Sequence, residues 1–240
     1  MSAIIIPGRR AFLGSLGAAL VTTKGLFAEE LTATAATTEG PFYPDRMPLD
    51  TDNDLLLIND ALTPAVGEVT WLSGRVLTTS GQPLRNAFVE IWQCDANESY
   101  LHTKGRGAKA DANFQGYGRF LTDSSGRYTF RTIKPVPYTL QGQFRSPHIH
   151  VAVSRGGTRL FTTQIAVRGH KDNPRDQVFR RLSSQALNSL SADFSPMSGA
   201  RAGELEARLD LVLGAMAAEG EDGVLRGGIG KPVGLGMRRR

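Results

Sequence analysis

The sequence predicts an all-β fold: a β-sandwich core with long loops, an extended N-terminal arm and little helix. Short runs rich in β-branched and aromatic residues recur along the chain and are separated by turn-forming residues. The chain has 27 glycines and 12 prolines, many of which lie between these runs. With 240 residues, of which 40% are hydrophobic and 21% charged, it is long enough to bury one core of this kind.

The predicted strands share this composition and end at polar or glycine-containing turns. They span residues 69–77, 87–92, 119–122, 127–132, 148–153, 160–167 and 205–213. The third and fourth strands form a hairpin through the turn at 123–126. We expect long loops at 94–117 and 133–147, and a helix at 176–190.

Changes in composition predict the domain limits. Residues 31–67 are polar and rich in turn formers, which predicts an arm over the core, and residues 68–215 form the sandwich domain. Residues 216–240 are rich in glycine and arginine and are expected to form a flexible basic tail.

Residues 1–30 resemble an export signal. Arg9 and Arg10 precede an apolar run at 11–21, which is shorter than the roughly 20 residues needed to span a bilayer. The paired arginines are typical of a twin-arginine signal, and a frayed N-terminal helix is the alternative. We therefore predict a protein exported to the periplasm or the cell exterior, which in its mature form lacks this signal and has no integral membrane segment.

The charge balance and the cysteine content exclude two classes of function. Arg9, Arg10 and the arginines at 238–240 account for the formal net charge of +5, so the rest of the chain is about neutral and nucleic acid is not an expected partner. The single cysteine, Cys94, excludes an internal disulfide and a thiolate metal cluster. We expect its side chain to be buried.

The segment His148-Ile149-His150 is the first indication of a metal site. In a strand, residues two apart point to the same face, so the two imidazoles can converge on one ion while Ile149 faces the core. A lone histidine pair in a strand is more often structural. However, the rigid loop at 135–137 presents Tyr138 ten residues before His148, which strengthens the metal-site interpretation.

Arg145 and Tyr100 extend this candidate site. Arg145 brings a cation close to His148 in sequence, and Tyr100 begins the long loop that follows the strand at 87–92. Phenolate is a hard oxygen donor suited to a ferric ion, and iron also accepts imidazole. A bound trivalent cation would lower the free tyrosine pKa of about 10. Zinc fits less well, because no Cys, Asp or Glu lies at zinc-like spacing around the histidines.

Five segments place these residues in a wider framework. They are VEIWQ at 89–93 with Tyr100 after it, TDSSGRYTFRTIKP at 122–135, PY at 137–138, RSPHIH at 145–150 and FTTQ at 161–164. In order and spacing this set resembles the intradiol ring-cleavage dioxygenases, and it most resembles the catalytic chains of the protocatechuate-cleaving members. The resemblance extends from about residue 38 to about residue 213.

The resemblance implies one Fe(3+) ion with four protein ligands, Tyr100, Tyr138, His148 and His150. It implies that Tyr138 is displaced when both hydroxyls of the substrate bind the metal, and that Arg145 and Gln164 border the substrate as catalytic residues. The implied reaction cleaves a catechol-type ring with O2 between its two hydroxyl-bearing carbons and gives a muconate-type diacid. Catechol, protocatechuate, hydroxyquinol and larger catechols are all candidate substrates.

Two features bear on the substrate and on the assembly. Residues 139–143, TLQGQ, follow Tyr138 and lack the aromatic residue that protocatechuate enzymes carry beside this tyrosine. The sequence therefore does not predict the shape of the substrate pocket. Residues 37–44, TTEGPFYP, resemble the arm of this family. That resemblance implies that Tyr43 approaches a pocket, either in its own chain or in a neighbouring subunit of a homo-oligomer.

The alternative to an enzyme is a non-enzymatic, prealbumin-like sandwich module, which residues 76–90 would suit equally well. Such a module has no need of two tyrosines and two histidines beside an arginine. An extradiol dioxygenase is the enzymatic alternative, but that chemistry prefers two histidines and one carboxylate on Fe(2+). We expect His102 and His170 to be solvated loop residues, and Tyr117 and Tyr128 to be packing residues.

Overall fold

The computed structural model describes most of the chain from Glu30 onward. The described residues are 30–48, 50–59, 62–140, 142–199, 203–214, 218–219 and 225–226. The predicted export signal, apart from Glu30, and nearly all of the predicted basic tail lie outside the described residues, and both remain predictions. Within the described segments, no helix is long and apolar enough to cross a membrane.

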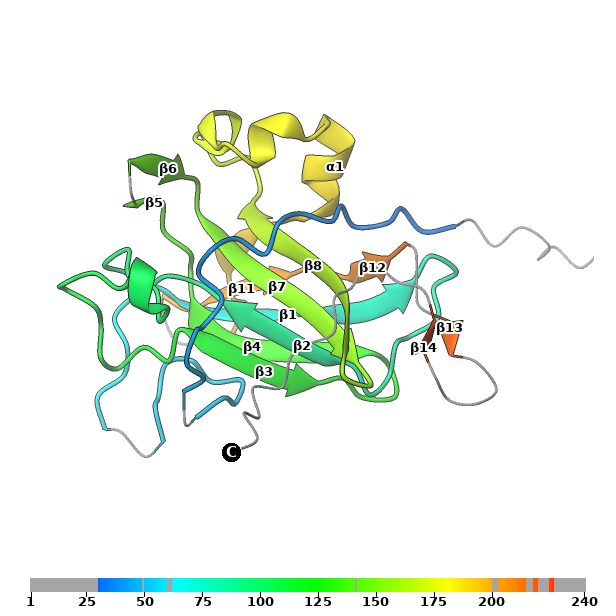
Figure 1. The fold of residues 1–240 in the computed structure, drawn as a ribbon, viewed down its shortest axis with the longest axis horizontal. Helices are drawn as coiled ribbons and strands as arrows, with labels where there is room; N and C mark the ends of the chain where they lie inside the picture. The colour runs from blue at the N-terminus through cyan, green and yellow to red at the C-terminus, as the bar shows by residue number, and fades with distance from the viewer. Residues whose placement is uncertain are drawn as a thin grey trace, which may run out of the picture. The chain divides into compact units, whose positions relative to one another are not determined.

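In the described part of the chain, the strands form two five-stranded sheets and two separate pairs (Figure 1). The first sheet contains β1 (Val69–Thr78), β4 (Arg127–Ile133), β10 (Phe194–Pro196), β11 (Leu205–Arg208) and β12 (Leu211–Leu213). The second has the order β3 (Tyr117–Leu121), β2 (Phe88–Trp92), β7 (His148–Arg155), β8 (Thr158–Val167) and β9 (Ser191–Ala192). The pairs are β5 (Tyr138–Leu140) with β6 (Gln143–Arg145), and β13 (Ala218–Glu219) with β14 (Leu225–Arg226).

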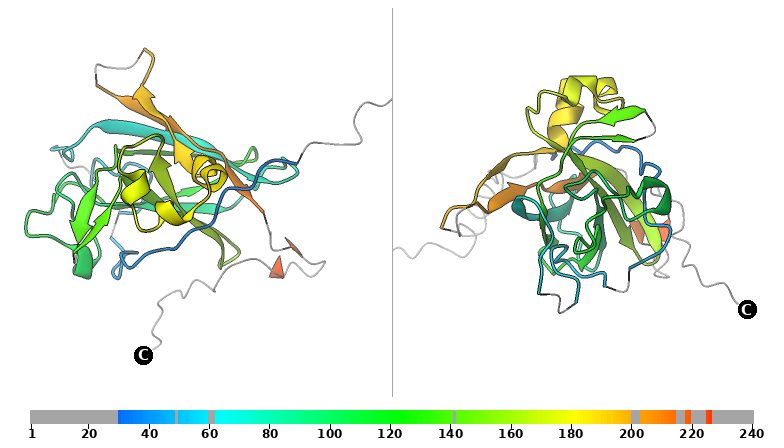
Figure 2. Two further views of the ribbon diagram at one scale, coloured as in Figure 1. Left: turned by 90° about the horizontal axis from the view of Figure 1, so that it is seen from above. Right: turned by 90° about the vertical axis from the view of Figure 1, so that its left-hand side faces the viewer.

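Helical structure in the described residues is confined to short segments. They are η1 (Thr103–Gly105), η2 (Asn173–Arg175), η3 (Phe179–Arg181) and α1 (Ser184–Ser189). The segment with η2, η3 and α1 lies at the same end of the second sheet as the β5–β6 hairpin (Figures 1 and 2). The prediction of an all-β fold with little helix is confirmed.

The main hydrophobic core is shared by the two sheets. Along β1, buried residues such as Leu72 and Val76 alternate with half-buried ones, as expected for a strand with one face in the core. β7 differs, because it is buried on both faces. Its Ile149 joins the main core, as predicted, whereas His148 and His150 point to the other side of the sheet.

Residues 35–43 of the arm cross this other side of the second sheet, whereas Leu55 and Leu56 of the arm join the main core. Its described residues between 31 and 67 contain no helix or strand. The Thr37 N–H donates to Thr162 O over 3.1 Å, and the Thr163 hydroxyl donates to Ala35 O over 2.7 Å. The arm is thus attached to β8 and covers the face on which His150 lies.

Two local predictions between 133 and 190 are wrong. The loop predicted at 133–147 contains the β5–β6 hairpin. The helix predicted at 176–190 is replaced by the two short segments η3 and α1, because the backbone is extended at Leu182 and a new helix begins after Ser183. The Ser183 side chain caps that helix by accepting the Ala186 N–H.

The strand predicted at 205–213 is interrupted at Leu209 and Asp210, leaving β11 and β12 as separate partners of β1. The Tyr128 hydroxyl donates to Leu209 O over 2.6 Å, and the Asp210 carboxylate accepts the Arg75 N–H over 2.9 Å. These side-chain contacts take the place of ladder hydrogen bonds at the break.

Gly74 of β1 provides a test of this packing. A Cβ added there would lie 1.8 Å from Leu209 O and 2.9 Å from the Tyr128 hydroxyl oxygen. We expect Gly74→Ala to lower the free energy of unfolding by about 3 kcal/mol, because backbone atoms would have to move.

The measurement is the urea concentration at the midpoint of unfolding, compared between variants whose free energy of unfolding depends on urea with the same slope. Gly157→Ala is the control: its φ is +76° and no atom lies within 4 Å of the added Cβ, so only backbone strain of about 1 kcal/mol is expected. Equal destabilisation by the two substitutions would contradict the packing at Gly74.

Candidate metal centre

Strand register brings the first site residues together. In the pairing of β2, β7 and β8, Trp92 lies opposite His150, and His150 lies opposite Gln164. Side chains of such cross-strand neighbours share one face of the sheet. The His150 ring stacks on Trp92 with 4.9 Å between ring centroids and 7° between the planes.

The two histidines are arranged as a pair of metal ligands would be. The Nδ1–H of His148 donates to Ser146 O over 2.6 Å, which leaves its Nε2 with a free lone pair. That Nε2 lies 3.1 Å from the Nε2 of His150. Metal–imidazole bonds of about 2.1 Å at right angles would place two nitrogens about 3 Å apart.

Both imidazoles are neutral near pH 7. Burial, together with the charge of Arg145, lowers the pKa of His148 to about 3. Burial and the neighbouring His148 hold the pKa of His150 well below its usual value. Neutral imidazole is the form that binds metals.

Tyr100 and Tyr138 complete the cluster. Their ring centroids lie 5.3 Å apart, and they approach the rings of His150 at 5.9 Å and His148 at 5.5 Å, respectively. Both tyrosines are buried, and burial raises the pKa of each phenol. The four predicted ligands are therefore neighbours in the structure.

The cluster fits a ferric ion. The Tyr100 hydroxyl is buried without a hydrogen-bond partner among the described residues, which is costly unless another group binds it. In the same residues, no group of three or more His, Cys, Asp or Glu could hold a metal. Two phenolates and two imidazoles are a donor set that Fe(3+) accepts, and a trivalent cation lowers the pKa of its phenol ligands.

Arg145 and Gln164, the two residues predicted to border the substrate, lie beside this cluster. Arg145 pairs with Tyr138 across the β5–β6 hairpin. Its Nη2 donates to Gln164 Oε1 over 2.5 Å, and Gln164 Nε2 donates to Thr38 O of the arm over 2.9 Å. The guanidinium is therefore directed toward the site and linked to the arm.

Asp176 was not found from the sequence. Its buried carboxylate accepts hydrogen bonds from Arg145 Nε at 2.9 Å and from the Ser146, Val178 and Phe179 N–H groups at 2.8–3.0 Å. Burial alone would raise the pKa of Asp176, but Arg145 and these N–H groups lower it below the usual value.

Asp176 thereby orients both Arg145 and the surroundings of His148. Ser146 binds the His148 ring nitrogen, and the Phe179 ring packs edge-on against His148 with 6.1 Å between centroids. No local pattern marks this aspartate, because it lies 31 residues after Arg145.

The arm contributes directly to the site. A Cβ on Gly40 would lie 3.0 Å from His150 Cε1, and the φ of +73° is one that other residues rarely adopt, so the close approach favours glycine here. Tyr43 packs edge-on against Trp92 with 5.0 Å between centroids, and its hydroxyl donates to Glu90 over 3.0 Å. Tyr43 therefore approaches the site of its own chain.

Glu90 and Arg159, also not found from the sequence, form a second buried polar cluster beside Trp92. Glu90 accepts the Tyr117 hydroxyl at 2.5 Å and Arg159 Nη2 at 3.2 Å. Arg159 Nη1 donates to Glu39 of the arm over 2.8 Å. Tyr117 is thus part of a hydrogen-bonded cluster, in addition to the packing role predicted for it.

The other residues singled out from the sequence are Cys94, Tyr128, His102 and His170, of which Cys94 packs in one cluster with Tyr100 and Tyr138. Cys94 is buried, which raises the pKa of its thiol to about 12. Tyr128 packs in the main core. His102 and His170 are half-buried instead of fully solvated: His102 Nδ1 accepts the Lys104 N–H at 3.0 Å, and His170 Nδ1 lies 3.8 Å from Asp172.

Comparison with known proteins identifies relatives of this chain. A family model described as "Dioxygenase" matches residues 38–214. The chain is 36% identical over 154 residues to the protocatechuate 3,4-dioxygenase beta chain of Burkholderia cepacia, covering 62% of this chain and 65% of that protein. It is 31% identical over 183 residues to hydroxyquinol 1,2-dioxygenase of Corynebacterium glutamicum, covering 67% and 58%. The chain spans between 51% and 65% of three such relatives.

Solved structures show the same fold. Catechol 1,2-dioxygenase from Pseudomonas arvilla C-1 is 26% identical, with a TM-score of 0.57, over 80% of this chain and 64% of that one. 3-Chlorocatechol 1,2-dioxygenase from Rhodococcus opacus 1CP is 21% identical, with a TM-score of 0.61, over 78% and 75%. The family match over most of the chain, together with these relatives, shows that the chain belongs to the intradiol ring-cleavage dioxygenase family.

Proposed function

We propose that this protein is an Fe(3+)-dependent intradiol dioxygenase. It cleaves a catechol-type ring between the two hydroxyl-bearing carbons and incorporates both atoms of O2, giving a muconate-type diacid. The observation that carries the proposal is the convergence of Tyr100, Tyr138, His148 and His150, with the two imidazole Nε2 atoms 3.1 Å apart.

The four ligands differ in how firmly the fold holds them. His148 and His150 lie on a central strand of a five-stranded sheet. Tyr100 stacks on Phe42 at 4.9 Å. Tyr138 lies on the three-residue strand of a separate hairpin, so it is the ligand that can leave with least disturbance. A bound Fe(3+) ion would supply a Lewis acid that holds both substrate oxygens and activates the ring toward O2.

Arg145 is proposed to stabilise negative charge that develops on the substrate. Its side chain is buried and its position is fixed by Asp176 and Gln164. A fixed cation in a site that excludes water interacts with such charge far more strongly than it would in solution. Gln164 holds the guanidinium on one side and the arm on the other.

The two alternatives are less well supported. A prealbumin-like binding module would not require four metal donors beside a buried arginine. An extradiol site requires a carboxylate ligand beside two histidines. Asp176, the carboxylate bonded to Arg145 next to this site, already accepts four hydrogen bonds.

Oxygen uptake with a substrate panel tests the activity. The names of the relatives define the panel as protocatechuate, catechol and hydroxyquinol, with phenol as a control that lacks the second hydroxyl. We expect one O2 consumed per ring for at least one member, a diacid product by mass spectrometry, and no reaction with phenol. No uptake with any catechol would contradict the proposed reaction.

Substitution of the ligands tests the iron site. We expect Tyr100→Phe and His150→Ala each to bind iron at least tenfold more weakly and to lose visible tyrosinate-to-iron absorption. Tyr128→Phe is the matched control, because this buried tyrosine bonds Leu209 O far from the site and should leave iron content unchanged. Wild-type protein that is colourless and holds stoichiometric zinc would refute the assignment.

Asp176→Asn tests the orientation of Arg145. The neutral amide weakens the bond to the guanidinium while the ligands remain, so kcat should fall about 10- to 100-fold with little change in iron content. Asp172→Asn is the control, since Asp172 pairs with the exposed Arg175. If kcat falls equally in both variants, the role given to Asp176 is wrong.

A further inference from the structure

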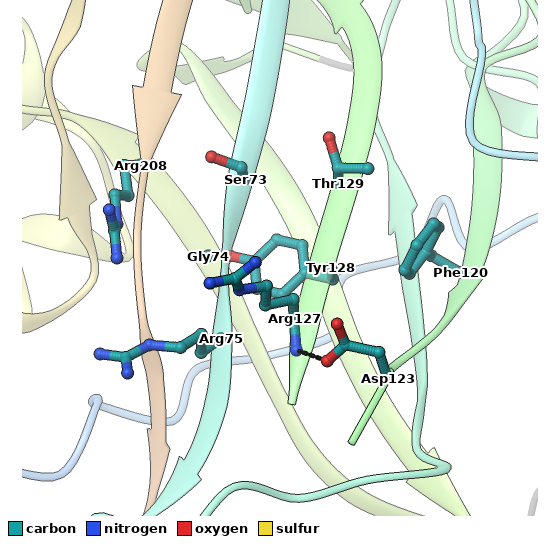
Figure 3. Close-up of a pocket in the computed structure, with 9 residues that line it drawn as sticks. All are labelled: Ser73, Gly74, Arg75, Phe120, Asp123, Arg127, Tyr128, Thr129 and Arg208. Carbon is teal, nitrogen blue, oxygen red and sulfur yellow. Dashed lines mark hydrogen bonds between the residues drawn. The ribbon is translucent and has the colours of Figure 1, made fainter. Parts of the chain in front are cut away.

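A groove lies on the first sheet, formed by strands β1, β4 and β11. It has a volume of about 390 Å³, within the range of small-molecule sites. We call it the arginine groove; its main lining residues are Ser73, Arg75, Phe120, Arg127, Thr129 and Arg208. Figure 3 shows the three arginines on three neighbouring strands.

The pairing of the strands brings several arginines close together in the groove. Arg75 lies directly opposite Arg127, and Ser73, two residues before Arg75, lies opposite both Thr129 and Arg208. Like charges in directly opposed positions of a sheet repel each other. A repulsive arrangement of this kind is relieved when an anion binds between the cations.

The carboxylates near the groove do not balance this charge. Asp210 binds Arg75, with 2.7 Å between Oδ2 and Nη2. Asp123 is occupied with its own turn, where Oδ1 accepts the N–H groups of Ser125 and Arg127 (Figure 3). In the part of the chain that the structure describes, neither the Arg127 nor the Arg208 side chain has a hydrogen bond or an ion pair. Two guanidiniums are thus available to a ligand.

The floor of the groove is rigid. Gly74 packs so closely on Leu209 O that no side chain fits, and the Tyr128 hydroxyl donates to the same carbonyl over 2.6 Å. Phe120 adds an apolar wall, and the Ser73 and Thr129 hydroxyls line the groove. The site therefore combines cations, hydroxyl groups and one apolar surface on an ordered base.

We propose that the arginine groove binds a small organic dicarboxylate. Arg127 and Arg208, the two arginines without a partner in the described residues, lie on β4 and β11, the strands on either side of β1 (Figure 3). Neighbouring strands lie about 4.8 Å apart, so β4 and β11 are separated by about 10 Å across β1. That spacing suits two carboxylates joined by a short carbon chain, with one carboxylate bound by each arginine. A muconate-type product is a dicarboxylate of this class. Only the identification of the ligand with that product rests on the proposed function.

Calorimetric titration of the full-length protein tests the groove. The probes are adipate, cis,cis-muconate, the monocarboxylate hexanoate and inorganic phosphate. We expect one dicarboxylate per chain, bound more tightly than hexanoate or phosphate and weakened by added salt. Arg127→Gln and Arg208→Gln should each weaken dicarboxylate binding about tenfold or more, because each removes a charged hydrogen-bond donor. Arg180→Gln, an exposed arginine outside the groove, should bind as the wild type does.

Unchanged dicarboxylate binding in the double variant Arg127→Gln/Arg208→Gln would overturn the proposal, since the ligand would then bind elsewhere. Phosphate binding as tight as adipate binding would overturn the dicarboxylate assignment in favour of a general anion site. Oxygen uptake by the double variant should equal that of the wild type. Binding is measured without turnover, so failure of the groove and failure of the proposed reaction are separate outcomes.

Discussion

The antiparallel register of β7 against β2 and β8 is the constraint on which the site depends. It aligns Trp92, His150 and Gln164 across three strands, on the face away from the main core. Because strand side chains alternate, a slip of one residue would turn His148 and His150 into the core and expose Ile149 on the site face. The free energy gained by burying the apolar residues of β7 thus also holds the candidate ligands in place.

A β-bulge between β7 and β8, beyond the row of Trp92, His150 and Gln164, places a further residue on the face that carries the site. The register shifts between Val153 and Ser154, so Ser154 pairs with Arg159 while Leu160 enters the main core. Arg159 can therefore bind Glu90 and the arm next to Trp92. Buried charges are tolerated only when they are paired, and here Arg159 has Glu90, as Arg145 has Asp176. The charged residues beside the site are thus paired with one another. The two tyrosines and two histidines are the uncharged groups that the proposed Fe(3+) would bind.

The sequence by itself determined the features whose signals are local. Alternating and β-rich runs predicted the all-β class and most strands, because strand geometry imposes a period of two residues. The same period placed His148 and His150 on one face. Tyr100 and Tyr138 depended on the family framework, since no spacing rule connects a loop tyrosine to a distant histidine pair.

Only the tertiary structure decided which distant groups complete each local feature. Asp176 and Glu90 meet their arginines across 31 and 69 residues, and nothing in their immediate sequence marks them. At the break, the Tyr128 side chain of β4 binds Leu209 O, and the Asp210 side chain itself binds the Arg75 N–H of β1, in place of ladder hydrogen bonds. A local pattern states which face of a strand a residue occupies. The packing of the sheets and the arm decides which segment covers that face and which charged group lies beside the residue. These contacts join residues that are remote in sequence, so no local pattern predicts them.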